Sequence, residues 1–124
     1  MPEMTYTLLY VDSPADSARF YAALLGRQPV EMSPTFALFV MQNGSKLGLW
    51  SRHTVEPAAE GAPGCAEIGF AVGDDAAVSA LHRDWTSKCV AIVQEPVTLD
   101  FGFTFTARDP DGHRLRVFAP GESQ

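Results

Sequence analysis

The sequence predicts an α+β fold of two β-α-β-β-β modules, each a curved antiparallel sheet with a helix on one face. Strand-like and helix-like segments follow one another in the same order in residues 4–52 and in residues 65–120. A hairpin signal, Asn-Gly at 43–44 and Asp-Gly at 111–112, occupies the same place in each order. Residues 53–64, rich in Pro, Ala, Glu and Gly, have no periodicity and indicate a linker.

The first module begins with a strand and a helix. Residues 5–11, TYTLLYV, are rich in β-branched and aromatic residues, which favours a buried strand. Ser13 before Pro14 is typical of a helix start and Gly26 of a helix end, so a helix is expected over residues 14–25. Three short strands should follow, near residues 29–32, 36–42 and 46–51. The Asn-Gly pair between the last two predicts a type I′ turn.

The second module repeats this order. A helix is expected to begin at Asp74 or Asp75, because Val78, Leu81 and Trp85 then lie on one face. The expected strands are residues 67–72, 90–93, 98–107 and 113–119.

Length and charge limit the function. A chain of 124 residues predicts one domain, 1–124, and a net charge of −6 argues against a nucleic-acid partner. No apolar run reaches the ~20 residues of a membrane span, so a soluble, cytoplasmic protein is expected. Cys65 and Cys89 have no metal-binding spacing and are expected to be buried apolar residues in a reducing compartment.

Side chains alternate along a strand, so one face of each sheet should pack on the helix and the other should line a cavity. Two modules side by side, in one chain or between two chains, would then enclose a ligand cavity. The residues expected on the cavity side are Tyr6, Leu8, Tyr10, Gly48, Trp50, Glu67, Gly69, Ala71 and Arg116.

This cavity side combines aromatic rings with one acid and one base. Trp50 offers the largest stacking surface, with Phe36 or Phe39, Phe101 and Phe103 nearby, and the two glycines leave room beside it. Each of these rings could instead be core packing.

Arg116, in the stretch DPDGHRLRVF, has two interpretations. It forms an ion pair with Glu67, or it binds a carboxylate or carbonyl of a ligand while Glu67 orients it. The three histidines, His53, His82 and His113, share no spacing and are expected at the surface. No Ser or Thr pattern predicts a catalytic residue.

The strand-helix opening YVDSPADSARFYAALLG and the DPDG turn before HRLRVF resemble the vicinal oxygen chelate superfamily over residues 6–119. This superfamily includes glyoxalase I, extradiol dioxygenases, and fosfomycin and bleomycin resistance proteins. Its enzymes hold a divalent metal at four strand positions, which the resemblance carries onto Tyr6, Gly48, Glu67 and Arg116. Only Glu67 is a plausible ligand there, so no metal or other cofactor is expected.

Within the superfamily, the chain is most similar to the metal-free phenazine-antibiotic resistance proteins, in the stretches LGLWSRH, EPV, DFGFTF and DPDGHRLRV. It also resembles the bleomycin resistance proteins, which bind drugs in the same way. The resemblance implies a homodimer that sequesters a flat aromatic antibiotic or metabolite for drug resistance, and a binding protein rather than an enzyme. The alternatives are a glyoxalase-like metal-dependent lyase or dioxygenase, and an accessory carrier in an aromatic natural-product pathway. The expected ligand-binding residues are Trp50, Arg116, Glu67, Tyr6, Phe39, Gly48, Phe101 and Phe103.

Overall fold

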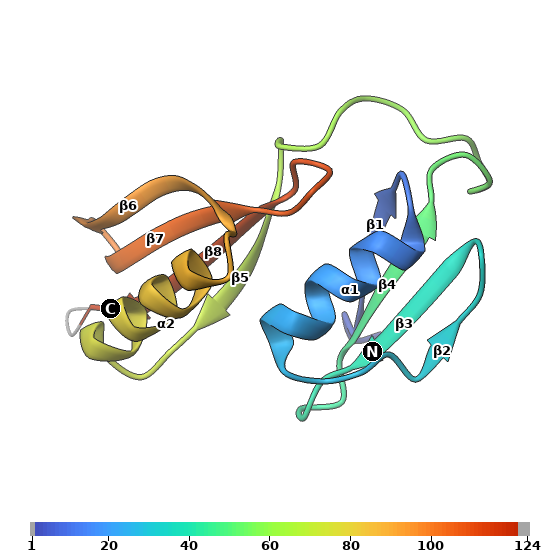
Figure 1. The fold of residues 1–124 in the computed structure, drawn as a ribbon. Coiled ribbons are helices and arrows are strands. Elements are labelled where there is room, and N and C mark those ends of the chain that lie inside the picture. Colours follow the sequence, from blue (N-terminus) through green and yellow to red (C-terminus); the bar gives the residue numbers. More distant parts are fainter. Residues whose placement is uncertain (1, 122–124) are drawn as a thin grey trace. The chain divides into compact units, whose positions relative to one another are not determined.

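The β-α-β-β-β arrangement occurs twice, in units Met1–Gly61 and Ala62–Gln124, called here the first and second module. The computed structural model describes residues 2–121 (Figure 1). Residues 52–66 contain no helix or strand, and the linker role expected for residues 53–64 stays a prediction. The single domain predicted for residues 1–124 stays a prediction.

The first module is a mixed four-stranded sheet with one helix. Its elements are β1 (Tyr6–Val11), α1 (Pro14–Leu25), β2 (Glu31–Met32), β3 (Phe36–Val40) and β4 (Lys46–Ser51). The strand order is β1-β4-β3-β2, with β1 parallel to β4 and the other pairs antiparallel. The sheet was predicted to be antiparallel, but its β1–β4 pair is parallel. The helical crossover brings β2 into the direction of β1, and the two tight turns that follow bring β4 into the same direction.

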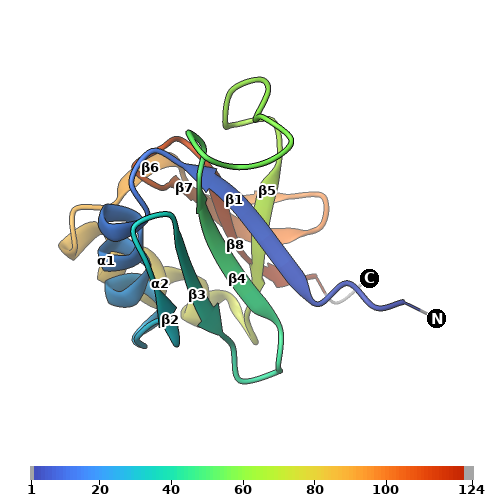
Figure 2. The same ribbon diagram turned by 90° about the vertical axis from the view of Figure 1, so that its right-hand side faces the viewer.

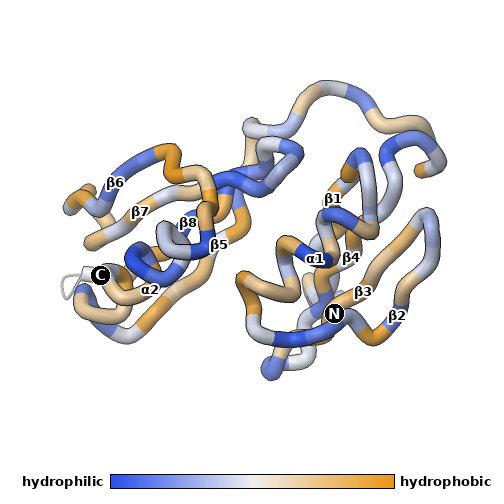
Figure 3. The backbone as a smooth tube through the Cα atoms, viewed as in Figure 1, coloured by the Kyte–Doolittle hydropathy of each residue, from blue (hydrophilic) through white to orange (hydrophobic). Residues whose placement is uncertain are grey.

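Helix α1 has the predicted bounds because both of its ends are fixed locally. The Ser13 hydroxyl accepts a hydrogen bond from the Asp16 amide (3.2 Å), and Gly26 ends the helix with φ of 65°. Blue and orange segments alternate along the helix in Figure 3, and its buried side includes Tyr21 and Leu24. Figure 2 shows α1 on one face of the sheet of β1, β4 and β3.

The second module repeats the topology. Its elements are β5 (Glu67–Ala71), α2 (Asp75–Ser87), β6 (Ala91–Leu99), β7 (Gly102–Arg108) and β8 (Arg114–Pro120). The strand order is β5-β8-β7-β6, again with one parallel pair, β5 and β8.

The core of the second module forms where α2 packs on its sheet. Asp74 caps the helix by accepting a hydrogen bond from the Ala77 amide (2.8 Å). Trp85 is almost completely buried and packs edge-on against Phe70 and Phe105, with ring centroids 5.7 and 5.4 Å apart. None of the helices that the structure describes is long and apolar enough to cross a membrane.

The boundary between β6 and β7 differs from the prediction. A short strand 90–93 and a long strand 98–107 were expected, but β6 continues through Pro96 to Leu99 and the chain turns before Gly102. β6 is an edge strand, where proline is tolerated because its missing N–H can face away from the neighbouring strand. Its pairing with β7 is irregular on both sides of Gln94.

The two hairpin turns share one geometry, but it is not type I′. In each turn, the carbonyl of the first residue accepts from the amide of the fourth, Gly44 to Met41 (3.0 Å) and Gly112 to Asp109 (3.0 Å). The amide of the first residue donates to the carbonyl of the fifth, Met41 to Ser45 (2.8 Å) and Asp109 to His113 (2.9 Å). Type I′ needs positive φ at two positions, whereas only the glycines here have it, at 88° and 103°. A type I turn followed by a left-handed glycine accounts for both turns.

Two predictions about individual residue types were also wrong. Cys65 and Cys89 are exposed rather than buried, since both lie in connecting segments. His82 and His113 are half-buried rather than on the surface. His82 packs edge-on against Phe105, with centroids 5.2 Å apart, and His113 lies in the DPDG turn.

Candidate functional site

We call the side of each sheet away from its helix the open face. On the open face of the second module, Arg116 and Glu67 form a two-pronged ion pair. Arg116 Nε and Nη2 each donate to one carboxylate oxygen of Glu67, at 2.8 Å in both cases. The Arg116 side chain is 18% exposed and that of Glu67 33%, so water reaches the pair only in part.

Strand pairing places these two side chains within reach. β5 is parallel to β8, with Glu67 opposite Arg114 and Gly69 opposite Arg116. Gly69 has no side chain, so nothing at that position stands between the guanidinium and Glu67. The hydrogen bonds from Arg116 lower the pKa of the Glu67 carboxyl below its ordinary value, and the same bonds raise the pKa of Arg116.

The rest of the guanidinium is also held. Nη1 donates to the Thr104 hydroxyl (3.2 Å) and lies 3.5 Å from Gln94 Oε1. The guanidinium carbon lies 5.6 Å from the centre of the Phe101 ring, within cation–π range. Of the two interpretations made from the sequence, the structure supports the ion pair with Glu67 as the resting arrangement.

The open face of the first module is apolar. Trp50 is half-buried and meets the Phe36 ring edge-on, with centroids 6.2 Å apart. Three large side chains of β1, Tyr6, Leu8 and Tyr10, are exposed. This face therefore offers aromatic and aliphatic surface, with Lys46 Nζ 5.2 Å from the Tyr6 ring centre and an exposed acid, Glu31, opposite Leu38.

The space expected above Gly48 is filled. A Cβ atom at Gly48 would lie 2.5 Å from Leu8 Cδ2 and 3.0 Å from Phe36 Cζ. The glycine accommodates these two side chains and leaves no room for a ligand at that point. At Gly69 the nearest atom to such a Cβ belongs to Phe118, at an ordinary 3.4 Å.

Two aromatic residues predicted to contact ligand lie on the helix side. Phe39 pairs with Leu47 and is fully buried, so of the two candidates in β3 it is Phe36 that shares a face with Trp50. Phe103 pairs with Ala119 and has the parity of Phe105, which packs on Trp85. Both are corrections with one cause, since side chains on one strand alternate between faces.

Sequence reasoning missed several open-face residues of the second module. They are Gln94, Thr104, Thr106 and Phe118, which lie on the same face as Arg116 by strand pairing. The alternating run Phe103-Thr104-Phe105-Thr106 could have indicated them, because it sends phenylalanines to the helix and threonines to the opposite face.

The positions that the resemblance links to a metal do not suit one. Both oxygens of Glu67 are engaged by Arg116, whose positive charge opposes a cation. In the first module, Gly48 offers no donor atom and its space is occupied by apolar side chains.

A second group of possible ligand atoms, in Asp109, Asp111 and His113, belongs to the DPDG turn. Asp109 Oδ1 accepts three backbone N–H groups, from Asp111, Gly112 and His113, each at 2.9 Å. Its Oδ2 lies 2.8 Å from His113 Nδ1. The buried Asp109 carboxylate therefore organises the turn.

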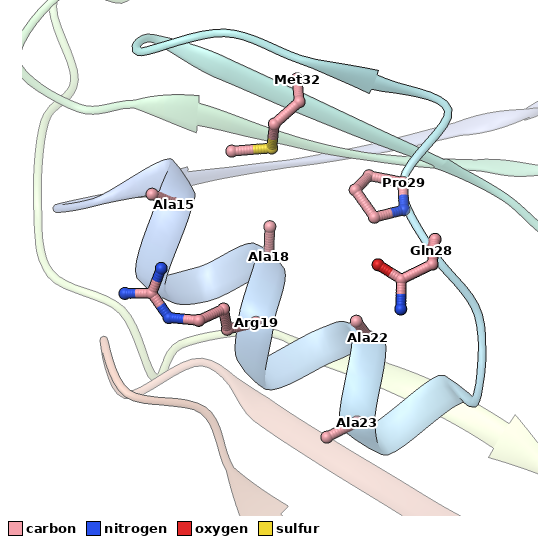
Figure 4. Close-up of a pocket in the computed structure, with 8 residues that line it drawn as sticks. All are labelled: Ala15, Ala18, Arg19, Ala22, Ala23, Gln28, Pro29 and Met32. Carbon is pink, nitrogen blue, oxygen red and sulfur yellow. The ribbon is translucent and has the colours of Figure 1, made fainter.

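A groove of about 630 Å³ lies on the helix side of the first module, between α1 and β2. Figure 4 shows Met32 and Pro29 facing alanines of α1 across it. Its single charged lining residue, Arg19, is paired with Asp16. The groove has no residue of the predicted site.

The sequence of the chain is similar to those of known proteins. Residues 3–117 match the Glyoxalase/Bleomycin resistance protein/Dioxygenase superfamily. The chain is 34% identical over 113 residues to the phenazine antibiotic resistance protein EhpR of Enterobacter agglomerans, covering 89% of this chain and 86% of that one.

Solved structures give the same fold. A protein of Agrobacterium tumefaciens, solved by solution NMR, is 55% identical with a TM-score of 0.89, covering 98% of this chain and 99% of that one. A glyoxalase-related enzyme of Fulvimarina pelagi is 22% identical with a TM-score of 0.84, covering 96% and 88%, a likeness that concerns the fold alone. The chain belongs to the glyoxalase/bleomycin resistance protein/dioxygenase superfamily, and it is related to a phenazine antibiotic resistance protein.

Proposed function

We propose that this protein binds a flat aromatic antibiotic or related metabolite without a metal, and that it acts by sequestration in drug resistance or self-protection. The observation that carries the proposal is the Arg116–Glu67 pair, which occupies the carboxylate that a family metal would need. Metal-dependent lyase and dioxygenase chemistry requires a cation to polarise the substrate. The donor set favours binding over that chemistry.

The open face of the first module supplies the second support. A planar polycyclic ligand is held by stacking and by burial of its apolar faces, which needs exposed aromatic surface on a rigid sheet. Trp50, braced edge-on by Phe36, provides such a surface, and Tyr6 and Tyr10 extend the apolar area along β1. The relationship to a phenazine antibiotic resistance protein points to the same class of ligand.

The experiment is an isothermal calorimetric titration of the purified protein with phenazine. We expect saturable binding with no conversion of the ligand. Trp50→Ala should weaken the affinity roughly tenfold or more, since a stacked ring contributes about 1–3 kcal/mol. Phe39→Leu is the matched control, because Phe39 is buried on the helix side. Equal affinity of wild type and Trp50→Ala would remove Trp50 from the site.

Metal content and assembly test the remaining parts of the proposal. Elemental analysis should find no zinc, nickel, manganese or iron near one per chain, and such an ion would favour the lyase or dioxygenase alternative. The proposed homodimer should give twice the 13.4 kDa chain mass in light scattering. A mass of one chain at micromolar concentration would contradict it.

A further inference from the structure

The open face of the second module contains a buried hydroxyl without a partner. Thr106 has 0% exposure, and its Oγ1 has no hydrogen-bond partner among the described residues. Buried polar atoms are nearly always paired, so an unpaired one in the middle of a sheet calls for an explanation. The neighbouring Thr104 shows the ordinary case, since its hydroxyl donates to Val117 O (2.8 Å) and accepts from Arg116.

Thr106 lies between Arg116 and Gln94 on three adjacent strands. It pairs with Arg116 of β8 on one side and with Gln94 of β6 on the other. Paired residues of antiparallel strands share a face, so all three side chains stand on the open face. Arg116 Nη1 and Gln94 Oε1 approach to 3.5 Å, and this bridge spans the Thr106 position.

The bridge differs in strength from the ion pair beside it. At 3.5 Å the contact with Gln94 is at the limit of a hydrogen bond, whereas both contacts with Glu67 are 2.8 Å and charge-assisted. Displacing the Gln94 amide is therefore easy and displacing Glu67 is not. A bound molecule can open the bridge while the ion pair stays in place.

We propose that Thr106 and Gln94 form a hydrogen-bonding subsite for an uncharged acceptor of the ligand, such as an aromatic ring nitrogen or a carbonyl oxygen. The inference rests on the proposed function, and it adds residues and a ligand chemistry to it. The Thr106 hydroxyl donates to the acceptor, and the displaced Gln94 amide supplies a second donor.

The charge balance sets the preference for an uncharged group. Glu67 neutralises Arg116 and takes the Nε–H and one Nη2–H, so the ion pair offers a ligand carboxylate no net positive charge. A neutral ring nitrogen or carbonyl needs no counter-charge and only a hydrogen-bond donor. The subsite therefore selects a neutral edge of the ligand.

Calorimetric titration of phenazine and of phenazine-1-carboxylate into four proteins, the wild type and three variants, tests the inference. Thr106→Val keeps the shape but removes the hydroxyl, and should weaken phenazine binding roughly tenfold, the value of one hydrogen bond in a dry site. Thr106→Ser should keep the wild-type affinity. The wild type should bind phenazine more tightly than phenazine-1-carboxylate, and Glu67→Gln should narrow that difference.

Thermal unfolding of Thr106→Val provides a readout without ligand. Because the hydroxyl has no partner, its removal should leave Tm unchanged or slightly higher. A marked fall in Tm would mean that the hydroxyl is already paired, and would overturn the inference. Equal phenazine affinity of wild type and Thr106→Val would also overturn the inference, but it would leave the proposed function intact. Failure of the wild type to bind phenazine would overturn the proposed function and this inference together.

Discussion

The open faces of the two modules carry opposite chemistry at equivalent positions. The parallel strand pair fixes the equivalence: Tyr6 lies opposite the first residue of β4, as Glu67 lies opposite the first residue of β8. Two residues further along the second strand of each pair, Gly48 in β4 corresponds to Arg116 in β8. One topology thus presents aromatic surface in one module and an ion pair in the other.

The glycine of the parallel strand pair lies on different strands in the two modules, on the second strand (β4) in the first module and on the first strand (β5) in the second. In the first module Gly48 lies opposite Leu8, whose side chain leans over it; in the second, Gly69 lies opposite Arg116. In both modules one member of the cross-strand pair is a glycine and the other is large. Gly48 accommodates the side chain of Leu8, whereas a Cβ at Gly69 would meet only Phe118. The large residue opposite each glycine decides whether the face is apolar or charged.

The largest expected effect comes from breaking the ion pair with Arg116→Met. Glu67 then loses two hydrogen bonds and its counter-charge while it stays partly buried, so we expect a loss of about 1–3 kcal/mol in the free energy of unfolding. Urea denaturation followed by the fluorescence of Trp85, in a Trp50→Phe background, reports on the second module. Trp85 suits this use because it is buried in that module's core.

Two further variants sharpen this prediction. Lys46→Met removes a charge from the open face of the first module, where the structure shows a cation–π contact with Tyr6, and should change stability by less than about 0.5 kcal/mol. Glu67→Met combined with Arg116→Met should recover part of the loss, because no unpaired charge remains. A double variant as unstable as Arg116→Met would contradict the account.

The two glycines give the next prediction. Gly48→Ala forces the ends of the Leu8 and Phe36 side chains to move, since a Cβ would lie 2.5 and 3.0 Å from them, and should cost up to about 1 kcal/mol. Gly69→Ala meets only an ordinary contact of 3.4 Å with Phe118 and should be neutral or stabilising. Amide hydrogen exchange of the two modules measures both changes, and equal effects would show that the glycines do not have these separate roles.

Local features made much of this fold predictable. The bounds of α1 followed from Ser13, Pro14 and Gly26, because caps act within one turn of the helix. The parity of Arg116 followed from its alternation with Leu115 and Val117 along a short strand after the DPDG turn. Such features need no knowledge of the rest of the molecule.

Features that depend on distant strands were not predictable in this way. Phe101 and Phe103 were both expected near Trp50, but the turn before Gly102 separates them. Phe101 reaches the Arg116 side and Phe103 the helix side. The bridge from Arg116 to Gln94 crosses three strands with irregular pairing, which no local pattern specifies.

A smaller effect is expected where the two helices end. Gly26 and Cys89 occupy the same position after the last turn of their helices. In each case the amide of the following residue donates to the carbonyl five residues before it: Arg27 to Ala22 (3.3 Å) and Val90 to Trp85 (3.0 Å). Both have left-handed φ, 65° and 63°, which favours glycine. Cys89→Gly should therefore stabilise by about 0.5–1 kcal/mol and Gly26→Ala destabilise by a similar amount, measured by urea denaturation. A loss of stability in Cys89→Gly would be the contrary result.

The smallest expected effect is the pH dependence of the ion pair. The pKa of Glu67 is lowered by hydrogen bonds from Arg116, so its stabilising effect is present above the ordinary value of 4.5 and is lost as pH falls through the lowered value. Glu67→Gln should thus cost stability at pH 7 and much less at pH 3, with a difference of about 1 kcal/mol or less because a third of the Glu67 side chain is exposed. In an Arg116→Met background the substitution should lose this pH dependence, because the hydrogen bonds that lower the pKa are gone. If the dependence persisted there, the shift would have to come from another charge, and Arg114, opposite Glu67 on β8, would be the next residue to replace.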